Sequence, residues 1–145
     1  MKDKSGNDKQ SNSENTTQDN SKLFKKLGIL NLTQTLIILI FISTILSLEF
    51  VQWNILNVLD DINDTNFADQ AADLTEYPKI SNRIFIITTI VFLFINKDAY
   101  MTEVSLTGEE RDENAITDAW RNLLAVILVL FATYLNYTVL NRPKE

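Results

Sequence analysis

Three polar side chains in or beside apolar stretches are the residues best placed to do chemistry in this chain. Glu49 interrupts the stretch TILSLEFVQWNIL, Arg83 precedes the run IFIITTIVFLFI, and Asn136 lies in an uncharged run near the C-terminus. A charged group is costly inside hydrocarbon and is usually paired when it occurs there. We therefore expect Glu49, Arg83 and Asn136 to cluster between helices. The alternative is that each side chain reaches the membrane surface separately.

The amino-acid inventory removes most catalytic chemistry. The chain of 145 residues contains neither Cys nor His, which excludes disulfides, thiolate nucleophiles, imidazole catalysis and the usual zinc sites. It also contains no phosphate-binding loop, serine-hydrolase elbow or HExxH motif. We therefore expect a protein that is not an enzyme and that carries no cofactor and no metal. The net charge of −6 argues against nucleic acid as a partner, because phosphate contacts need clustered Lys and Arg.

An acidic stretch at 60–80 resembles a calcium loop only superficially. If Asp61 is taken as the first ligand, the position that requires glycine is Asn66, and the position that requires a bidentate glutamate is Ala72. A solvated acidic connector is the simpler interpretation, and weak attraction of cations is the alternative.

Polar and densely apolar segments alternate along the chain, which is typical of a membrane protein with polar tails and loops. Residues 1–22 contain no Leu, Ile, Val or aromatic residue, so they cannot bury enough surface to fold. We predict an all-α integral membrane protein with three transmembrane helices and a disordered N-terminal tail. The predicted segments are a polar cytoplasmic tail (1–22), a basic amphipathic lead-in (23–32), transmembrane helix 1 projecting beyond the membrane (33–59), an acidic loop (60–80), transmembrane helix 2 (81–101), an acidic capped helix or loop (102–121), transmembrane helix 3 (122–141) and a short tail (142–145).

The second predicted transmembrane helix has the shortest apolar core. Its run of twelve uncharged residues, IFIITTIVFLFI, gives about 18 Å at 1.5 Å per residue, against ~30 Å of hydrocarbon. Extension from Ser81 to Met101 reaches the required length, because Arg83 and Lys97 have long stems that can reach the headgroups. A re-entrant or surface segment is the alternative. Further on, Thr107 and Glu110 form a T-x-x-E pattern that predicts a capped helix start.

Further residue sets mark the membrane surfaces and possible helix contacts. The expected interface anchors are Trp53, Trp120, Lys97 and Arg121. Ser43 and Ser47, Thr88 and Thr89, and Ala125 and Ala132 are small residues that are expected to pack against neighbouring helices. Past Trp53 the helical pattern continues as a coiled-coil-like seam about two heptads long. The seam consists of Leu48, Val51, Ile55, Val58 and Ile62.

The distribution of Lys and Arg predicts the orientation. With three spans, the N-terminal tail holds six basic residues and the second loop three, against four on the opposite side. The positive-inside rule therefore places the N-terminus in the cytoplasm and the C-terminus on the outer side. If the second helix did not cross, both termini would be cytoplasmic.

These features favour a small non-enzymatic integral membrane protein that acts as an accessory or assembly subunit through helix–helix contacts. Its expected partners are the lipid bilayer and either another membrane protein or copies of itself. The alternative is an oligomeric pore or ion pathway, including a holin-like permeabiliser. The absence of a polar stripe along any predicted helix weighs against the pore.

Overall fold

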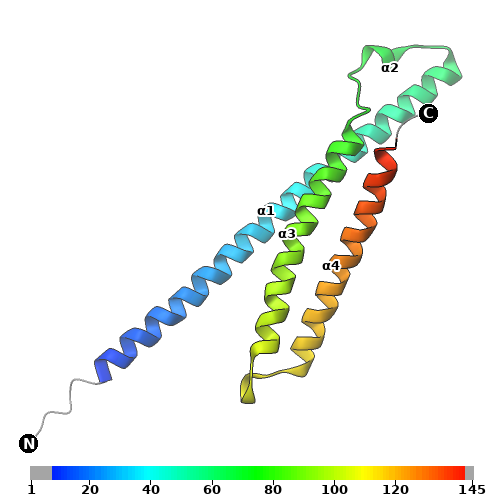
Figure 1. Cartoon of the computed structure of the whole chain (residues 1–145). Coiled ribbons are helices and arrows are strands. Elements are labelled where there is room, and N and C mark those ends of the chain that lie inside the picture. Colours follow the sequence, from blue (N-terminus) through cyan, green and yellow to red (C-terminus); the bar gives the residue numbers. More distant parts are fainter. Residues whose placement is uncertain (1–7, 143–145) are drawn as a thin grey trace, which may run out of the picture. The chain divides into compact units, whose positions relative to one another are not determined.

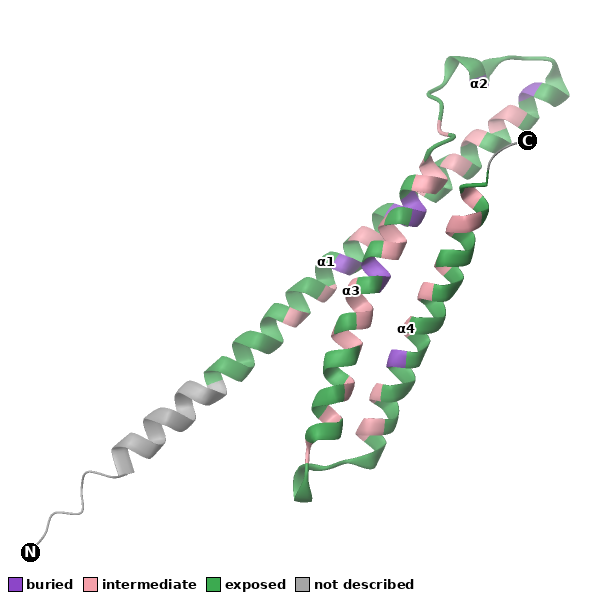
Figure 2. Cartoon of the chain, in the orientation of Figure 1, coloured by how far each residue is buried: buried purple, intermediate pink, exposed green. Residues whose placement is uncertain are grey.

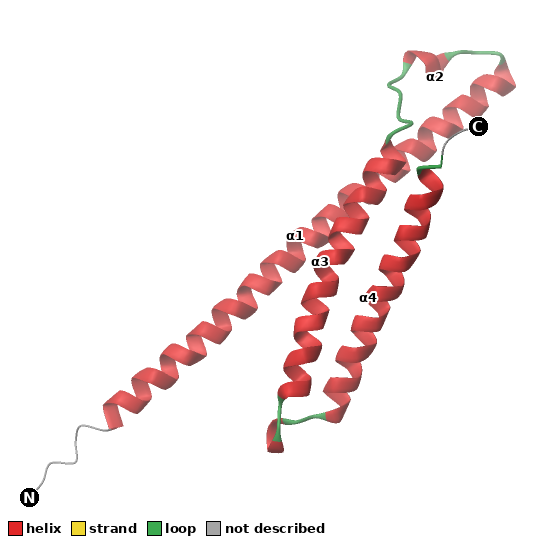
Figure 3. Cartoon of the chain, viewed as in Figure 1, coloured by secondary structure: helices red, strands yellow, loops and turns green. Residues whose placement is uncertain are grey.

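The protein is helical throughout the residues that the computed structural model describes, 8–142, apart from short connections (Figures 1 and 3). The elements are α1 (Asp8–Asn63), α2 (Phe67–Gln70), α3 (Tyr77–Ser105), the short 3-10 helix η1 (Gly108–Glu110) and α4 (Glu113–Leu140). Three of them, α1, α3 and α4, are long and apolar enough to cross a membrane. The prediction of an all-α protein with three membrane-spanning helices is therefore confirmed.

The chain divides into two units, Met1–Thr35 and Leu36–Glu145. In the first unit α1 begins at Asp8, whereas the sequence predicts a disordered tail as far as residue 22. Most of residues 8–22 are Asn, Ser, Thr and Asp, which are poor helix formers, but extending an existing helix needs no new nucleus. Residues 1–7 and 143–145, with their parts of the predicted tails, lie outside the described residues, as do the side chains before residue 20.

A left-handed residue ends α1 a few positions later than predicted. The helix continues past Leu59 to Asn63, and Asp64 then adopts φ 53°. The backbone N–H of Thr65 donates to Asp60 O at 3.0 Å, which is the bond of a Schellman C-cap. Aspartate occupies the position where glycine is usual, and its short polar side chain makes this conformation tolerable.

The second spanning helix, α3, is longer at both ends than predicted. It contains 29 residues, with Pro78 in its first turn, where the missing N–H of proline leaves no helical bond unmade. Its length of about 43 Å at 1.5 Å per residue exceeds the ~30 Å of a hydrocarbon core. Helix length therefore does not limit its ability to span.

Helices α3 and α4 form an antiparallel hairpin in which the two helices contact each other. The predicted capping box at Thr107 is wrong, because its side chain makes no capping hydrogen bond and Gly108 turns the chain at φ 65°. Helix α4 starts later, at Glu113, where the Asp112 carboxylate accepts from Asn114 N at 2.8 Å. This end of the hairpin is closed by the rings of Tyr100 and Trp120, whose centroids lie 5.6 Å apart.

Few of the described residues are buried (Figure 2), and most of those that are buried are polar. The buried apolar residues are Leu36, Ala68 and Leu123, and the buried polar residues are Ser43, Asp60, Ser81, Asn82, Thr88 and Thr89. This distribution suits helices in lipid, where association depends on small side chains and hydrogen bonds instead of exclusion from water.

Candidate functional site

Three serines join α1 to α3. Ser43 Oγ donates to Ser81 O at 2.9 Å, and Ser81 Oγ donates to Ser43 O at the same distance. Ser47 Oγ lies 2.8 Å from Ser81 Oγ, which can accept its proton. Each hydroxyl can therefore donate once, and Ser43 is 0% exposed. We call these residues the serine cluster. Their small side chains let the two backbones approach, and their hydroxyls pair within the contact.

Two threonines extend the buried polar face of α3. Thr88 is 0% exposed, and its Oγ1 donates to Ile84 O at 2.7 Å. Thr89 is also buried and donates to Phe85 O at 2.7 Å. Both hydroxyls are thus satisfied within their own helix, so these threonines contribute packing and not hydrogen bonds between helices.

The three polar residues predicted to cluster are not brought together. No hydrogen bond or ion pair in the described part of the chain joins Glu49, Arg83 and Asn136. Arg83 is exposed, and it lies two positions after Ser81, which places the two side chains on different faces of α3. Because Ser81 faces α1, Arg83 points away from it.

Glu49 instead lines a cavity of about 410 Å³ between α1 and the segment before α3. Trp53 and Tyr77 line the same cavity, and the Trp53 ring stacks on Phe50 with centroids 6.0 Å apart. A carboxylate beside two aromatic rings is an arrangement that can attract a cation. The Trp53 Nε1 is buried and makes no hydrogen bond with the described residues.

Asn136 lines a different space, a groove of about 690 Å³ between α3 and α4. Asn82 and Phe85 line it from α3, Ala132 lines it together with Asn136 from α4, and Ser47 of α1 also lines it. Asn82 was not among the predicted site residues, although it is 6% exposed and its Nδ2 donates to Thr133 O at 3.5 Å. The groove therefore gathers two carboxamides from different helices.

The predicted interface anchors lie near the ends of the apolar stretches. Trp120 packs on Tyr100, and Arg121 forms an exposed ion pair with Asp118 at 3.4 Å. Lys97 is exposed on α3, and Trp53 lies on α1 as described above. An exposed ion pair of this kind contributes little to stability.

The predicted seam of Leu48, Val51, Ile55, Val58 and Ile62 lies on α1 and is exposed along its whole length; we call it the α1 seam. Its five residues are between 51% and 72% exposed. The opposite side of α1 carries Glu49, Trp53 and Leu56, which face the cavity, together with the buried Asp60. Between Leu48 and Ile62, α1 thus packs one side on described parts of its own chain and leaves an apolar side exposed.

One buried carboxylate organises the loop between α1 and α3. Asp60 is 7% exposed; its Oδ1 accepts from Thr65 Oγ1 at 2.5 Å and its Oδ2 from Ala68 N at 2.6 Å. These bonds, together with one from Phe67 N, lower the pKa of the Asp60 carboxyl below its ordinary value. Both carboxylate oxygens of Asp60 accept hydrogen bonds that hold α2. Asp60 therefore has a structural role in the loop for which the sequence left weak attraction of cations as an alternative.

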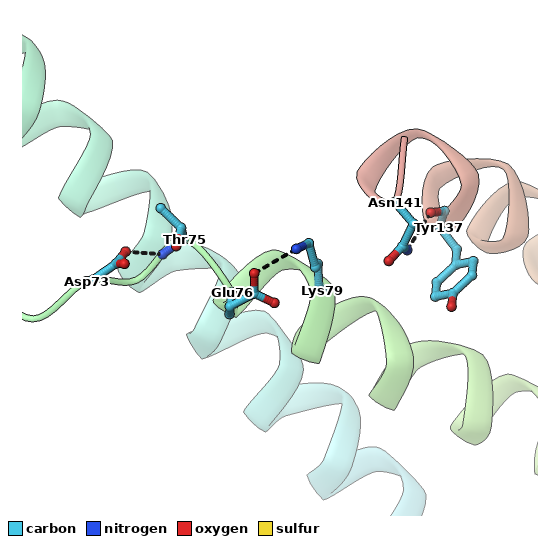
Figure 4. A network of polar contacts seen from close by, with 6 residues as sticks. All are labelled: Asp73, Thr75, Glu76, Lys79, Tyr137 and Asn141. Carbon is cyan, nitrogen blue, oxygen red and sulfur yellow. Dashed lines mark hydrogen bonds and ion pairs between the residues drawn. The ribbon is translucent and has the colours of Figure 1, made fainter. Parts of the chain in front are cut away.

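Weaker polar contacts hold the rest of this region (Figure 4). Thr75 N donates to Asp73 Oδ1 at 2.9 Å, which lowers the pKa of Asp73. Lys79 Nζ and Glu76 Oε1 are 2.6 Å apart at the start of α3. Across the described residues, no group of three or more acidic side chains is placed to hold a metal ion.

The lowered pKa of Asp60 predicts a pH dependence for the loop. Its folded-state pKa lies below the unfolded value of about 3.9, so the stabilisation is complete above about pH 4 and is lost as pH falls through the folded-state pKa. We expect the Ala68 amide proton shift, followed by NMR in detergent micelles, to titrate with a midpoint below that unfolded value. The Asp60→Asn variant should show no such titration. A midpoint at or above about pH 4 would contradict the assignment.

Comparisons with known proteins give no match: no protein-family model fits the chain, and neither curated proteins nor solved structures show a significant similarity.

Proposed function

We propose that the protein is a non-enzymatic accessory or assembly subunit of the membrane, and that the α1 seam binds another protein chain. The observation that carries this proposal is the exposure of all five seam residues. Ile55, Val58 and Ile62 follow the expected interfacial anchor Trp53, so in this topology they face water instead of lipid. The segment from Trp53 to Ile62 is about 14 Å long at 1.5 Å per residue.

A contiguous apolar face in water usually marks an interaction site. The seam contains no charged residue, and its spacing of three and four matches the pattern that one helix presents to another. Two flanking asparagines do not obstruct it, because Asn54 Nδ2 donates to Phe50 O and Asn57 Nδ2 donates to Trp53 O. A helix of the partner is the occupant that this geometry favours.

The proposed orientation has the N-terminus in the cytoplasm and the α1–α3 loop outside. It rests on the excess of Lys and Arg in the N-terminal tail and the α3–α4 connection. The seam would then meet a partner on the outer side of the membrane.

Single-cysteine labelling tests this orientation, since the native chain has no cysteine to interfere. In intact cells, a membrane-impermeant maleimide should label Gln70→Cys, in the α1–α3 loop. It should label Glu110→Cys, in the α3–α4 connection, only after the membrane is permeabilised. Labelling of both positions from the same side would rule out a crossing by α3.

The subunit proposal predicts a complex larger than the 16.6 kDa chain when the protein is purified from its native membrane in mild detergent. The complex should have a constant stoichiometry across detergents, as expected for a specific interface. A chain that purifies alone, and that conducts ions across liposomes in a manner abolished by Glu49→Gln, would contradict the proposal and support a pore.

A further inference from the structure

Two asparagines in the spanning helices have unpaired hydrogen-bonding groups, and both line the groove between α3 and α4. Asn82 Nδ2 reaches Thr133 O only at 3.5 Å, and its Oδ1 accepts no hydrogen bond from the described residues. The Asn136 carboxamide makes no hydrogen bond with these residues at all. A carboxamide can donate twice and accept twice, so most of the capacity of both groups is unused.

Two other asparagines, Asn96 in α3 and Asn141 directly after α4, bond to the backbone of the preceding turn. Asn96 Nδ2 donates to Phe92 O at 2.8 Å, and Asn141 Nδ2 donates to Tyr137 O at 2.8 Å. Asn82 and Asn136 lack this bond to the preceding turn. Lipid chains offer neither donors nor acceptors, so an unpaired amide in a span favours contact with another polar group.

The face of α4 that carries Asn136 also suits close approach by a second helix. Ala125, Leu128, Ala132 and Val139 share this face at spacings of three and four residues. All four are exposed, and no charged residue occurs between Leu123 and Leu140. Small residues on a spanning helix allow a neighbouring backbone to come near, which brings a carboxamide within hydrogen-bonding distance of its partner.

We propose that α4 of a second copy of this chain docks on the groove, and that the carboxamides of Asn82 and Asn136 pair across the interface. A second copy is the occupant favoured by the chemistry, because a carboxamide is both donor and acceptor and therefore complements an identical group. Under two-fold symmetry each such contact is made twice. This contact lies within the membrane and is independent of the α1 seam, which lies on another helix.

Resonance energy transfer between copies reconstituted in lipid vesicles tests the proposal, with donor and acceptor dyes on a cysteine introduced at Gln70. We expect association of the otherwise native chain, about tenfold weaker association of Asn136→Leu, and near-native association of Asn136→Gln, which keeps the carboxamide. The matched control is Asn96→Leu, whose amide already bonds to its own helix and whose loss should leave association unchanged.

Several results would overturn the proposal. One is transfer no greater than that expected from random proximity of the native chain in the bilayer. Another is association of Asn136→Leu equal to that of the native chain. A third is weakening by Val58→Asp but not by Asn136→Leu, which would assign self-association to the seam. Retention of a Ser47→Cys/Ser81→Cys crosslink in the Asn136→Leu background would exclude misfolding as the cause of weaker association.

Discussion

Replacement of Ser43 by leucine is expected to separate α1 from α3. Ser43 is 0% exposed and accepts and donates hydrogen bonds with Ser81. A larger side chain at a filled contact typically costs about 1–3 kcal/mol, and each lost hydrogen bond between membrane helices costs about 0.6 kcal/mol. The sum, roughly 2–4 kcal/mol, should lower the α1–α3 association constant by at least about thirtyfold.

A disulfide across the same contact reports the separation. Ser47 Oγ and Ser81 Oγ are 2.8 Å apart, so the Ser47→Cys/Ser81→Cys pair should crosslink readily, given a disulfide bond length of about 2.05 Å. Ser43→Leu should abolish most of this crosslinking, whereas Ser43→Ala should retain most of it. Thr44→Leu is the matched control, because Thr44 is exposed and bonds only to Ile40 O. Undiminished crosslinking in Ser43→Leu would show that the serine cluster does not hold the two helices together.

Replacement of Val58 by aspartate is expected to release the partner from the α1 seam. Burial of a valine side chain contributes about 1.5 kcal/mol or more, and an unpaired carboxylate in an apolar interface adds a further desolvation cost. The yield of the complex at limiting concentration should therefore fall by about tenfold or more. The chain itself should remain folded, because Val58 is 56% exposed.

Asn57→Asp is the matched control for this substitution. It introduces the same charge one position away, on a different face of α1, and it is nearly isosteric with the native residue. Complex yield should stay near the native level, and both variants should keep the crosslink between positions 47 and 81. Equal yields from Val58→Asp and the native chain would remove the seam as the binding surface.

Sequence periodicity was sufficient to predict the three spanning helices because each contains an uncharged, mainly apolar run of at least twelve residues. It predicted the boundaries less well. Helix α1 extends past Leu59 to Asn63 and ends before the left-handed residue Asp64. Aspartate tolerates this conformation, but nothing else in the sequence marks Asp64 as the place where the helix ends. The capping pattern at Thr107 failed because Gly108 turns the chain, and Asp112 caps α4 instead.

The contacts between the helices were harder to predict, because the prediction relied on charged side chains, which do not make them. The expected cluster paired Glu49 with Arg83 on the basis of opposite sign and similar depth. The contact between α1 and α3 is made instead by small hydroxyl residues. The Ser43–Ser47 step signalled one side of it, but Ser81 carries no periodic signal of its own. Which face of α3 meets α1 depends on helix rotation, and a single sequence does not specify that rotation.

The α1 seam was predictable because its pattern is local to one helix. The structure adds that no element of the described chain covers Val51, Ile55, Val58 or Ile62. Asn82 could not be predicted in this way, because it becomes a candidate only when the structure places it in the same groove as Asn136. Pairings between helices that are distant in sequence require the assembled fold.

Binding of a protein by the α1 seam is tested most directly by photo-crosslinking in the native membrane. A photoreactive residue is placed in turn at seam positions 51, 55, 58 and 62. The same residue is placed off the seam, at Asn57 and Asp61, as a control. We expect the four seam positions to give an adduct of one constant added mass, and the two off-seam positions to give little of it. That mass distinguishes a second copy of this chain from a different protein. Adducts to no protein at any seam position, or equal adducts at all six positions, would contradict the account.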